Sequence, residues 1–364
     1  MKGPRLVVTD IRARAVAAPM KRPLATSSGA ISTAPLPLLD LRTDAGIVGR
    51  SYLFGVGSHN LAPIAKLVEA MAEMLKGDAL APFEIERKLR TRYTLLGVHN
   101  IVLFALSGID MAAWDALGQA RGLPLVRLLG GLRRPVRAYN SKGLGILPLK
   151  PLITEAVELV QEGFEAVKLR LGRTSAEEDI AALRAVKKAI GPKVTLMVDF
   201  NQALSVAEAV KRGRMIDEEG GVFWIEEPVR ADDFAGCAKV AREVATPIQI
   251  GENFMGPEQM AQAIAAGACD YVMPDLQRIG GVSGWMRAAA LAQAAGLEMS
   301  SHLFPEASAH LLAVTPTCHW LEYVDWADPV LEEPAELRRG SVLIPERPGI
   351  GMKWNERAVK RYAI

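Results

Sequence analysis

The sequence predicts an α/β fold in which a parallel (β/α)₈ barrel follows a separate N-terminal α+β domain. First, short apolar runs alternate with amphipathic helical stretches from Pro135 onward, the pattern of successive βα units. Second, there are eight such runs at nearly regular intervals. Third, residues before about 130 do not share this rhythm. With 364 residues, the chain has room for two or three domains.

The eight runs are predicted as the strands of the barrel. They lie at 137–141, 166–171, 194–200, 222–227, 247–254, 270–275, 297–304 and 319–325. Helical spacing of apolar residues separates them, most clearly at 177–190 and 257–267. The pattern alone also allows an open doubly wound sheet. Eight regular units with continuous apolar strands favour the closed barrel, whose strands are covered by helices throughout.

The N-terminal region has strand-like segments at 6–16 and 35–53, followed by helical segments at 64–75 and 103–118. We therefore divide the chain into residues 1–130, an α+β domain, and 131–325, the barrel. The remaining segment, 326–364, is rich in Pro and Gly and contains a strand-like stretch at 341–345. It is too irregular for a barrel unit, and we expect it to pack back onto the first domain.

Composition excludes some classes of function. The 43 Lys and Arg residues nearly balance the 41 Asp and Glu residues, so the net charge of +2 indicates neither a nucleic-acid nor a membrane surface. The three cysteines, Cys237, Cys269 and Cys318, lack metal-ligand spacing and indicate buried thiols in a reducing compartment. No apolar run resembles a signal peptide or membrane segment. We expect a cytoplasmic protein.

Polar residues at the C-terminal ends of barrel strands are the candidates for chemistry, because the active site of such a barrel forms there. Nearly every predicted strand supplies one: Lys168 and Arg170, then Asp199, Glu226, Glu252, Asp275, His302 and Glu322. Successive candidates from Lys168 to Glu322 are 20 to 31 residues apart, about one βα unit each. All should therefore meet at one mouth of the barrel.

Asp199, Glu226 and Glu252 lie on three adjacent predicted strands. Three carboxylates brought together repel one another unless a cation lies among them. Magnesium prefers oxygen ligands in near-octahedral geometry and leaves positions for water and a substrate carboxylate. Any one of these acids could instead pair with a neighbouring base or cap a helix. Three successive strand ends together favour a magnesium site.

Asp275 and His302 form the second candidate group. Asp275 can accept a hydrogen bond from one ring nitrogen, which leaves the other nitrogen basic and directed at a substrate. Lys168, near a cation and a carboxylate, could neutralise anionic charge, although strand lysines also extend to the surface. Glu322 could be a general acid held protonated by partial burial, or a surface acid. The other histidines, His59, His99, His310 and His319, are interpreted as structural or surface residues.

The words around these residues resemble the enolase superfamily, and within it the mandelate racemase subgroup. They are Lys168-Leu-Arg170, Met197-Val-Asp199-Phe-Asn201, Trp224-Ile-Glu226-Glu227-Pro228, Gly251-Glu252-Asn253, Met273-Pro274-Asp275 and Ser300-Ser301-His302-Leu-Phe304. The resemblance extends over nearly the whole chain, including the segments at 107–118 and 316–322. A set of motifs this long and ordered is highly specific.

This resemblance implies that the first domain caps the barrel and that its loop at 24–32 lines the substrate pocket. It implies magnesium ligands at Asp199, Glu226 and Glu252, a His302–Asp275 dyad, Glu322 facing the enolate and Lys168 beside the substrate carboxylate. Ser141 and Asn201 would lie near the bound carboxylate. The implied chemistry is removal of the α-proton of a small carboxylic acid, with the charge of the enediolate stabilised where it develops. A homo-oligomer is also implied.

Arg170 departs from the pattern, because mandelate racemase has a second lysine there that acts as the base opposite histidine. A guanidinium rarely gives up its proton, since its pKa is above about 12. We therefore expect His302 to act alone, in the dehydration of a hydroxy or sugar acid. Racemisation or epimerisation of a 2-hydroxy acid is the alternative, favoured by the small, weakly polar residues at 25–33. A non-catalytic binding protein is a third reading, disfavoured by the three converging acids.

Overall fold

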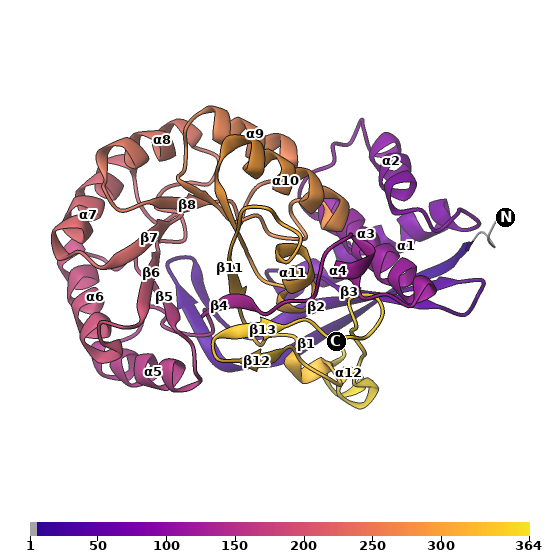
Figure 1. Ribbon diagram of the computed structural model, residues 1–364, viewed down its shortest axis with the longest axis horizontal. Helices are drawn as coiled ribbons and strands as arrows, with labels where there is room; N and C mark the ends of the chain where they lie inside the picture. Colours follow the sequence, from indigo (N-terminus) through magenta and orange to yellow (C-terminus); the bar gives the residue numbers. More distant parts are fainter. Residues whose placement is uncertain (1–5) are drawn as a thin grey trace.

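The computed structural model describes residues 6–364 and contains a closed barrel of parallel strands (Figure 1). Its eight strands are β4 (Val136–Asn140), β5 (Ala166–Arg170), β6 (Thr195–Asp199), β7 (Val222–Glu226), β8 (Ile248–Ile250), β9 (Tyr271–Val272), β10 (Glu298–Ser301) and β11 (Cys318–Tyr323). Each strand pairs in parallel with the next, and β11 pairs with β4 to close the barrel. The predicted barrel is confirmed.

Several strands are shorter than predicted, because the chain turns away from the barrel wall where the site begins. The run at 247–254 forms only β8. It ends before Gly251, whose φ of +141° and close approach to Met273 leave no room for a side chain. The run at 297–304 ends at Ser301, and the left-handed residues Leu303 and Phe304 turn the chain into the next helix. The spacing of apolar residues in the sequence does not predict such turns.

Seven helices connect the barrel strands and cover their outer faces. They are α5 (Leu149–Gln161), α6 (Ala176–Ile190), α7 (Val206–Glu219), α8 (Phe234–Glu243), α9 (Pro257–Ala265), α10 (Gly281–Ala295) and α11 (Pro305–Leu312). In α6, Ser175 and Glu178 form a reciprocal capping box, and the apolar residues Ile180 and Leu183 are buried. The chain leaves the barrel after β11 without an eighth barrel helix.

The N-terminal region forms an antiparallel sheet packed against helices, to the right of the barrel in Figure 1. Its elements are β1 (Val8–Thr26), β2 (Gly29–Thr43), β3 (Val48–Tyr52), the 3₁₀ turn η1 (Ser58–Asn60), α1 (Leu61–Leu75), α2 (Pro82–Arg92) and α3 (Asn100–Arg121), with the short α4 (Leu125–Leu128) leading to β4. Helix α3 is long and apolar enough to span a membrane by composition, but its most apolar window is 89% buried in the fold.

The segment 24–32, expected as a loop, is the end of the β1–β2 hairpin, with a turn at Ser27 and Ser28. The hairpin, indigo in Figure 1, reaches across to β5 and β6. Barrel loops hold its tip in place: the amide of Ile146 donates to the Ala25 carbonyl at 2.8 Å, and the Ser27 hydroxyl donates to the Phe200 carbonyl at 3.3 Å. The hairpin therefore forms part of the pocket wall.

The tail comprises η2 (Asp328–Val330), β12 (Glu336–Arg338), β13 (Ser341–Leu343) and α12 (Glu356–Tyr362). It contacts both parts of the molecule. The indole of Trp354 donates to Asp40 of β2 at 2.8 Å, but β13 pairs antiparallel with the start of β4. The pairing of β13 with β4 is a contact with the barrel that the sequence did not predict. This pairing buries Val342 and uses main-chain groups of β4 before it enters the barrel wall.

Candidate active site

A cavity of about 430 Å³ lies at the C-terminal ends of the barrel strands, beneath the β1–β2 hairpin. Its barrel wall includes Lys168, Arg170, Asp199, Asn201, Gln202, Glu252, Asn253, Asp275, Gln277, Arg278, His302, Leu303, Glu322, Val324 and Trp326. Its N-terminal wall includes Leu24, Thr26, Ser28, Ile31, Phe54 and Val56. Most of the predicted site residues therefore line one pocket, as expected for the C-terminal face of a barrel.

The three predicted metal ligands converge. Carboxylate oxygens of Asp199, Glu226 and Glu252 lie within 4.8 Å of one another, and the first two side chains are fully buried. Burial and the neighbouring carboxylates raise the pKa of Glu226 to about 8, against the opposing effect of Lys168. A divalent cation would relieve this repulsion. The donor set consists of carboxylate oxygens alone, which fits Mg²⁺ and not a softer metal.

Lys168 is buried on the floor of the pocket among three acids. Its Nζ lies 2.5 Å from Glu226 Oε1, 2.9 Å from Glu322 Oε1 and 3.3 Å from Asp199 Oδ2. Burial alone would lower the pKa of this lysine, but the surrounding carboxylates outweigh it and raise the pKa well above its ordinary value. Lys168 is therefore a fixed positive charge that faces two of the metal ligands and Glu322.

His302 and Asp275 form the predicted dyad. His302 Nδ1 lies 2.6 Å from Asp275 Oδ2, and a parallel β-bridge joins the two residues. The other ring nitrogen, Nε2, lies 3.3 Å from Glu252 Oε2 and 3.7 Å from Glu322 Oε2. Burial lowers the pKa of His302, but the carboxylates of Glu252, Glu322 and Asp275 together raise it to about 9. Asp275 fixes the ring so that Nε2 points toward the metal ligands.

Glu322 does not have the environment expected of a protonated general acid. Its carboxylate accepts hydrogen bonds from Lys168 Nζ at 2.9 Å, the Ser141 hydroxyl at 2.7 Å and the Leu303 amide at 3.0 Å. Burial opposes ionisation, but Lys168 and His302 outweigh burial and lower the pKa of Glu322 below its ordinary range. This environment favours the ionised form of Glu322, whereas the sequence-based expectation was a protonated acid.

Arg170 is held by the loop that follows β4. Its Nη1 donates to the carbonyls of Ser141 at 3.0 Å and Gly143 at 2.6 Å, and its Nη2 donates to the Ser141 hydroxyl at 2.7 Å. Ser141 is fully buried behind Glu322 and does not line the pocket, so the expected contact with a bound carboxylate is not supported. Its hydroxyl instead links Arg170 to Glu322.

Asn201 follows Asp199 and lines the pocket. Its main-chain amide donates to Asp199 Oδ1 at 2.7 Å and its side-chain amide donates to Asp199 Oδ2 at 3.0 Å. Its Oδ1 is buried, and no residue within 6–364 donates a hydrogen bond to it. A φ of +44° holds the backbone in the left-handed region that Asn tolerates. The residue thus orients Asp199 and keeps one acceptor for a ligand.

The remaining histidines lie outside the pocket. His310 is buried, accepts from the Val126 amide at 3.1 Å and faces the Ile350 carbonyl at 3.2 Å. Burial lowers the pKa of both His310 and His319 to about 4, so both are neutral. His59 and His99 are both exposed in the N-terminal region.

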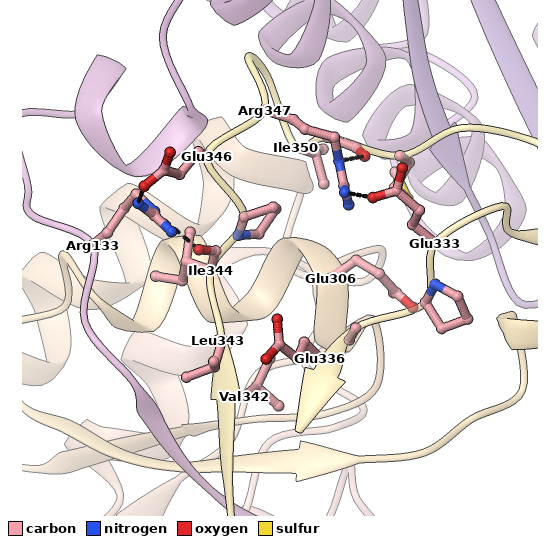
Figure 2. Close-up of a pocket in the computed structure, with 15 residues that line it drawn as sticks. Arg133, Glu306, Glu333, Glu336, Val342, Leu343, Ile344, Glu346, Arg347 and Ile350 are labelled. Carbon is pink, nitrogen blue, oxygen red and sulfur yellow. Dashed lines mark hydrogen bonds and ion pairs between the residues drawn. The ribbon is translucent and has the colours of Figure 1, made fainter. Parts of the chain in front are cut away.

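A second cavity of about 430 Å³ lies between the tail and α11 (Figure 2). Its arginines are already paired: Arg133 contacts Glu346 and the Ile344 carbonyl, and Arg347 contacts Glu333. These pairs neutralise the charges that would otherwise attract an ionic ligand. The strand-end pocket is therefore the candidate active site.

The sequence analysis missed several wall residues. Gln277 and Arg278 lie two and three residues after Asp275, and their place after a strand end was the available signal. The rings of Phe54 and Trp326 are in tilted contact with centroids 5.1 Å apart, one from the N-terminal region and one after β11. Their contact depends on how the two regions pack together, and no local pattern reports it.

An eight-stranded barrel whose strand ends gather three carboxylates, a His–Asp pair and a buried lysine defines an enzyme that uses a divalent metal ion. The chain belongs to the mandelate racemase/muconate lactonizing enzyme family of the enolase superfamily. Residues 8–130 match the N-terminal domain of that family, and residues 152–358 match the enolase C-terminal domain-like family.

Individual relatives point the same way. L-talarate/galactarate dehydratase of Salmonella typhimurium is 36% identical over 85% of this chain and 78% of its own length. An enolase from the alphaproteobacterium BAL199, solved with bound magnesium, is 45% identical, with a TM-score of 0.96 over 99% of this chain and all of its own. An enolase from Bradyrhizobium, complexed with magnesium and mandelic acid, is 43% identical, with a TM-score of 0.95 over the full length of both chains.

Proposed function

We propose that this protein catalyses the magnesium-dependent dehydration of a hydroxy acid or sugar acid, with His302 as the base that removes the α-proton. The observation that carries this proposal is the contrast between two strand ends. His302 directs Nε2 toward the metal ligands, whereas the two Nη atoms of Arg170 donate to Ser141 and Gly143. One face of a bound α-carbon would therefore meet a base and the other a fixed cation.

Asp199, Glu226 and Glu252 would hold the magnesium ion, since their oxygens converge within 4.8 Å. When bound, the ion supplies a Lewis acid for the substrate carboxylate. Lys168, held protonated among its acids, would favour the negative charge that develops on the substrate as the α-proton leaves. Asn201 Oδ1, buried without a donor from residues 6–364, would accept a hydrogen bond from a substrate hydroxyl.

The proton balance needs only one titrating residue. Magnesium bound at Glu252 would offset one of the charges that raise the pKa of His302 and so favour its neutral form. Neutral His302 Nε2 takes the α-proton and becomes an imidazolium that Asp275 stabilises through the 2.6 Å hydrogen bond. The C–O bond to the β-hydroxyl then breaks, and the imidazolium returns the proton to that oxygen, which leaves as water. The enol product tautomerises to a 2-keto-3-deoxy acid. Glu322, ionised and bonded to Lys168, would position the lysine and not donate a proton.

Racemisation of an apolar 2-hydroxy acid is a second candidate, because part of the pocket wall is apolar. The apolar side chains that line this part of the pocket are Leu24, Ile31, Phe54, Val56 and Trp326. Few of these side chains can form hydrogen bonds with the hydroxyls of a sugar acid. The Bradyrhizobium relative complexed with mandelic acid supports this candidate, and the dehydratase of Salmonella supports the first.

One assay distinguishes dehydration, racemisation and non-catalytic binding. The protein with Mg²⁺ is incubated with a panel of sugar monoacids, sugar diacids and aryl 2-hydroxy acids, and products are followed by semicarbazone absorbance and by chiral chromatography. Formation of a 2-keto acid supports dehydration. Interconversion of enantiomers without a keto acid supports racemisation. Acid binding without either reaction leaves the non-catalytic reading. His302→Asn is the matched control in each case.

We also propose a cytoplasmic, self-associating enzyme. The three cysteines are free thiols, which suits a reducing compartment. Leu149, Ile153 and Val157 recur every fourth residue on α5 and stay exposed, a stripe that another copy could cover. Light scattering coupled to size-exclusion chromatography tests the assembly, and a monomer at micromolar concentration would refute it.

A further inference from the structure

Gln277 joins the N-terminal region to the dyad through both its side chain and its main chain. Its side chain is buried, and its Oε1 accepts from the Phe54 amide at 2.8 Å while its Nε2 donates to the Phe54 carbonyl at 3.2 Å. Its own amide donates to Asp275 Oδ1 at 2.8 Å. A single residue thus touches both the capping segment around Phe54 and the carboxylate that orients His302.

The two oxygens of the Asp275 carboxylate have different hydrogen-bond partners. Oδ1 accepts from the main-chain amides of Gln277 at 2.8 Å and Arg278 at 3.0 Å. Oδ2 faces His302 Nδ1 at 2.6 Å. The two amides therefore set the rotation of the carboxylate, and the carboxylate sets the plane of the imidazole. Any movement of the 277–278 main chain is passed to His302 by two short bonds.

The other end of the connection is also part of the site. Phe54 lines the pocket and packs at a tilt against Trp326, which follows β11, with ring centroids 5.1 Å apart. The β1–β2 hairpin is anchored to the barrel through the main-chain bond between Ala25 and Ile146. For Phe54, both main-chain polar groups instead bond to the side chain of Gln277.

We propose that Gln277 is a positioning residue for proton abstraction, through which docking of the Phe54 segment fixes Asp275 and hence His302. This inference rests on the proposed function, in which His302 is the base. Glutamine suits the position because one neutral amide offers an acceptor for N–H and a donor for C=O at the same time. A glutamate would keep the acceptor but place a second anionic oxygen against the Phe54 carbonyl, and a methionine would offer neither bond.

The test compares Gln277→Met, Gln277→Glu and Ser283→Ala. Ser283 is the matched control, because it also bonds the N-terminal region to the barrel, through Asp110 and Trp114, but away from the pocket. The rate measured is Mg²⁺-dependent exchange of the substrate α-proton in deuterium oxide. We expect kcat to fall about 10- to 100-fold in Gln277→Met, as for other residues that orient a catalytic group, with unchanged magnesium affinity. Gln277→Glu should lose less, and Ser283→Ala should stay within about twofold of the wild type.

A second readout does not depend on turnover. The imidazole N–H proton shared with Asp275 should give a downfield NMR signal, identified by its loss in His302→Asn. We expect this signal to shift or broaden in both Gln277 variants and to stay in place in Ser283→Ala. The Gln277 variants could lose only thermal stability, as expected for Ser283→Ala, and keep both kcat and this signal unchanged. In that case Gln277 is merely structural and the proposal is overturned. If no acid is turned over by the wild type, the proposed function fails, and the NMR comparison still decides the role of Gln277.

Discussion

Lys168 Nζ lies 2.5 Å from Glu226 Oε1, so a buried lysine already occupies the charge-balancing position between a metal ligand and Glu322. One lysine cannot balance Asp199, Glu226, Glu252 and Glu322 together. The raised pKa of Glu226, about 8, reflects this excess of negative charge in a buried place. The pocket is therefore arranged to bind a cation strongly, with Lys168 as the fixed charge that faces Asp199, Glu226 and Glu322.

Magnesium binding should depend on Glu226. We expect Glu226→Gln to weaken Mg²⁺ binding by at least about 100-fold, since removing a direct ligand costs no less than removing an outer-shell partner. Isothermal titration calorimetry measures the affinity. Glu306→Gln is the control, because Glu306 is also a buried acid but bonds only the Tyr52 hydroxyl among side chains, at 2.7 Å. Equal affinities in the two variants would remove Glu226 from the ligand set.

Proton abstraction should depend on His302. We expect His302→Asn to reduce α-proton exchange by about 10² to 10⁴, the range for loss of a general base, with Mg²⁺ affinity kept. Asp275→Asn should also reduce exchange, because the 2.6 Å bond to Nδ1 would lose its anionic acceptor. Exchange is followed by proton NMR in deuterium oxide. Near-native exchange in His302→Asn would move the base elsewhere, with Lys168 as the next candidate.

The sequence was sufficient for features that repeat along the chain. Strand ends such as Asp199, Glu226 and His302 could be located because each follows an apolar run, and parallel strands in a barrel bring such ends together. Protonation was not predictable in this way. The ionised form of Glu322 is favoured by Lys168 on β5 and by the Leu303 amide that follows β10. The hydrogen bond from the Ser141 hydroxyl to Glu322 was not predictable for the same reason, because it depends on three-dimensional packing.

Contacts between the N-terminal region and the barrel could not be predicted from the sequence either. Gln277 looks like an ordinary loop residue in the sequence, and its partner Phe54 is 223 residues away. Hydrogen bonds between a side chain and a distant main chain leave no periodic signal, because any residue except proline offers the same N–H and C=O groups.

Stability should fall on mild acidification because His310 is buried in its neutral form. Its pKa of about 4 in the folded state lies below the ordinary value of 6.5, so the unfolded chain binds more protons between these values. The contribution of neutral His310 is complete above pH 6.5 and is lost as the pH falls toward 4. At pH 5 the loss should be about 2 kcal/mol, at about 1.4 kcal/mol per pH unit.

Urea unfolding of the wild type and His310→Gln at pH 7 and pH 5 measures this contribution. The glutamine amide can still accept from the Val126 amide and donate to the Ile350 carbonyl. We expect the variant to lose about 2 kcal/mol less than the wild type between the two pH values. Exposed His99→Gln is the control and should keep the wild-type slope. An unchanged slope in His310→Gln would show that this histidine is protonated or accessible in the folded protein.

Exchange of the α-proton should be confined to one enantiomer of the substrate, because Arg170 cannot serve as the second base. Its guanidinium donates to the Ser141 and Gly143 carbonyls at 3.0 and 2.6 Å, and a guanidinium rarely gives up its proton. Each enantiomer of a turned-over acid is incubated with enzyme and Mg²⁺ in deuterium oxide, and proton NMR follows the α-position. Comparable exchange of both enantiomers would restore the racemase hypothesis.

If exchange is confined to one enantiomer, the Arg170→Lys variant becomes informative. A lysine lacks the planar fork that bonds two carbonyls, and the nearby positive charge of Lys168 should lower the pKa of that lysine toward that of a base. We expect this variant to exchange the second enantiomer at a rate above that of the wild type, at some loss of thermal stability. Arg170→Met is the control, since it also loses the carbonyl bonds but offers no base. Equal exchange of the second enantiomer in the Lys and Met variants would show that the change comes from loosened packing and not from a new base.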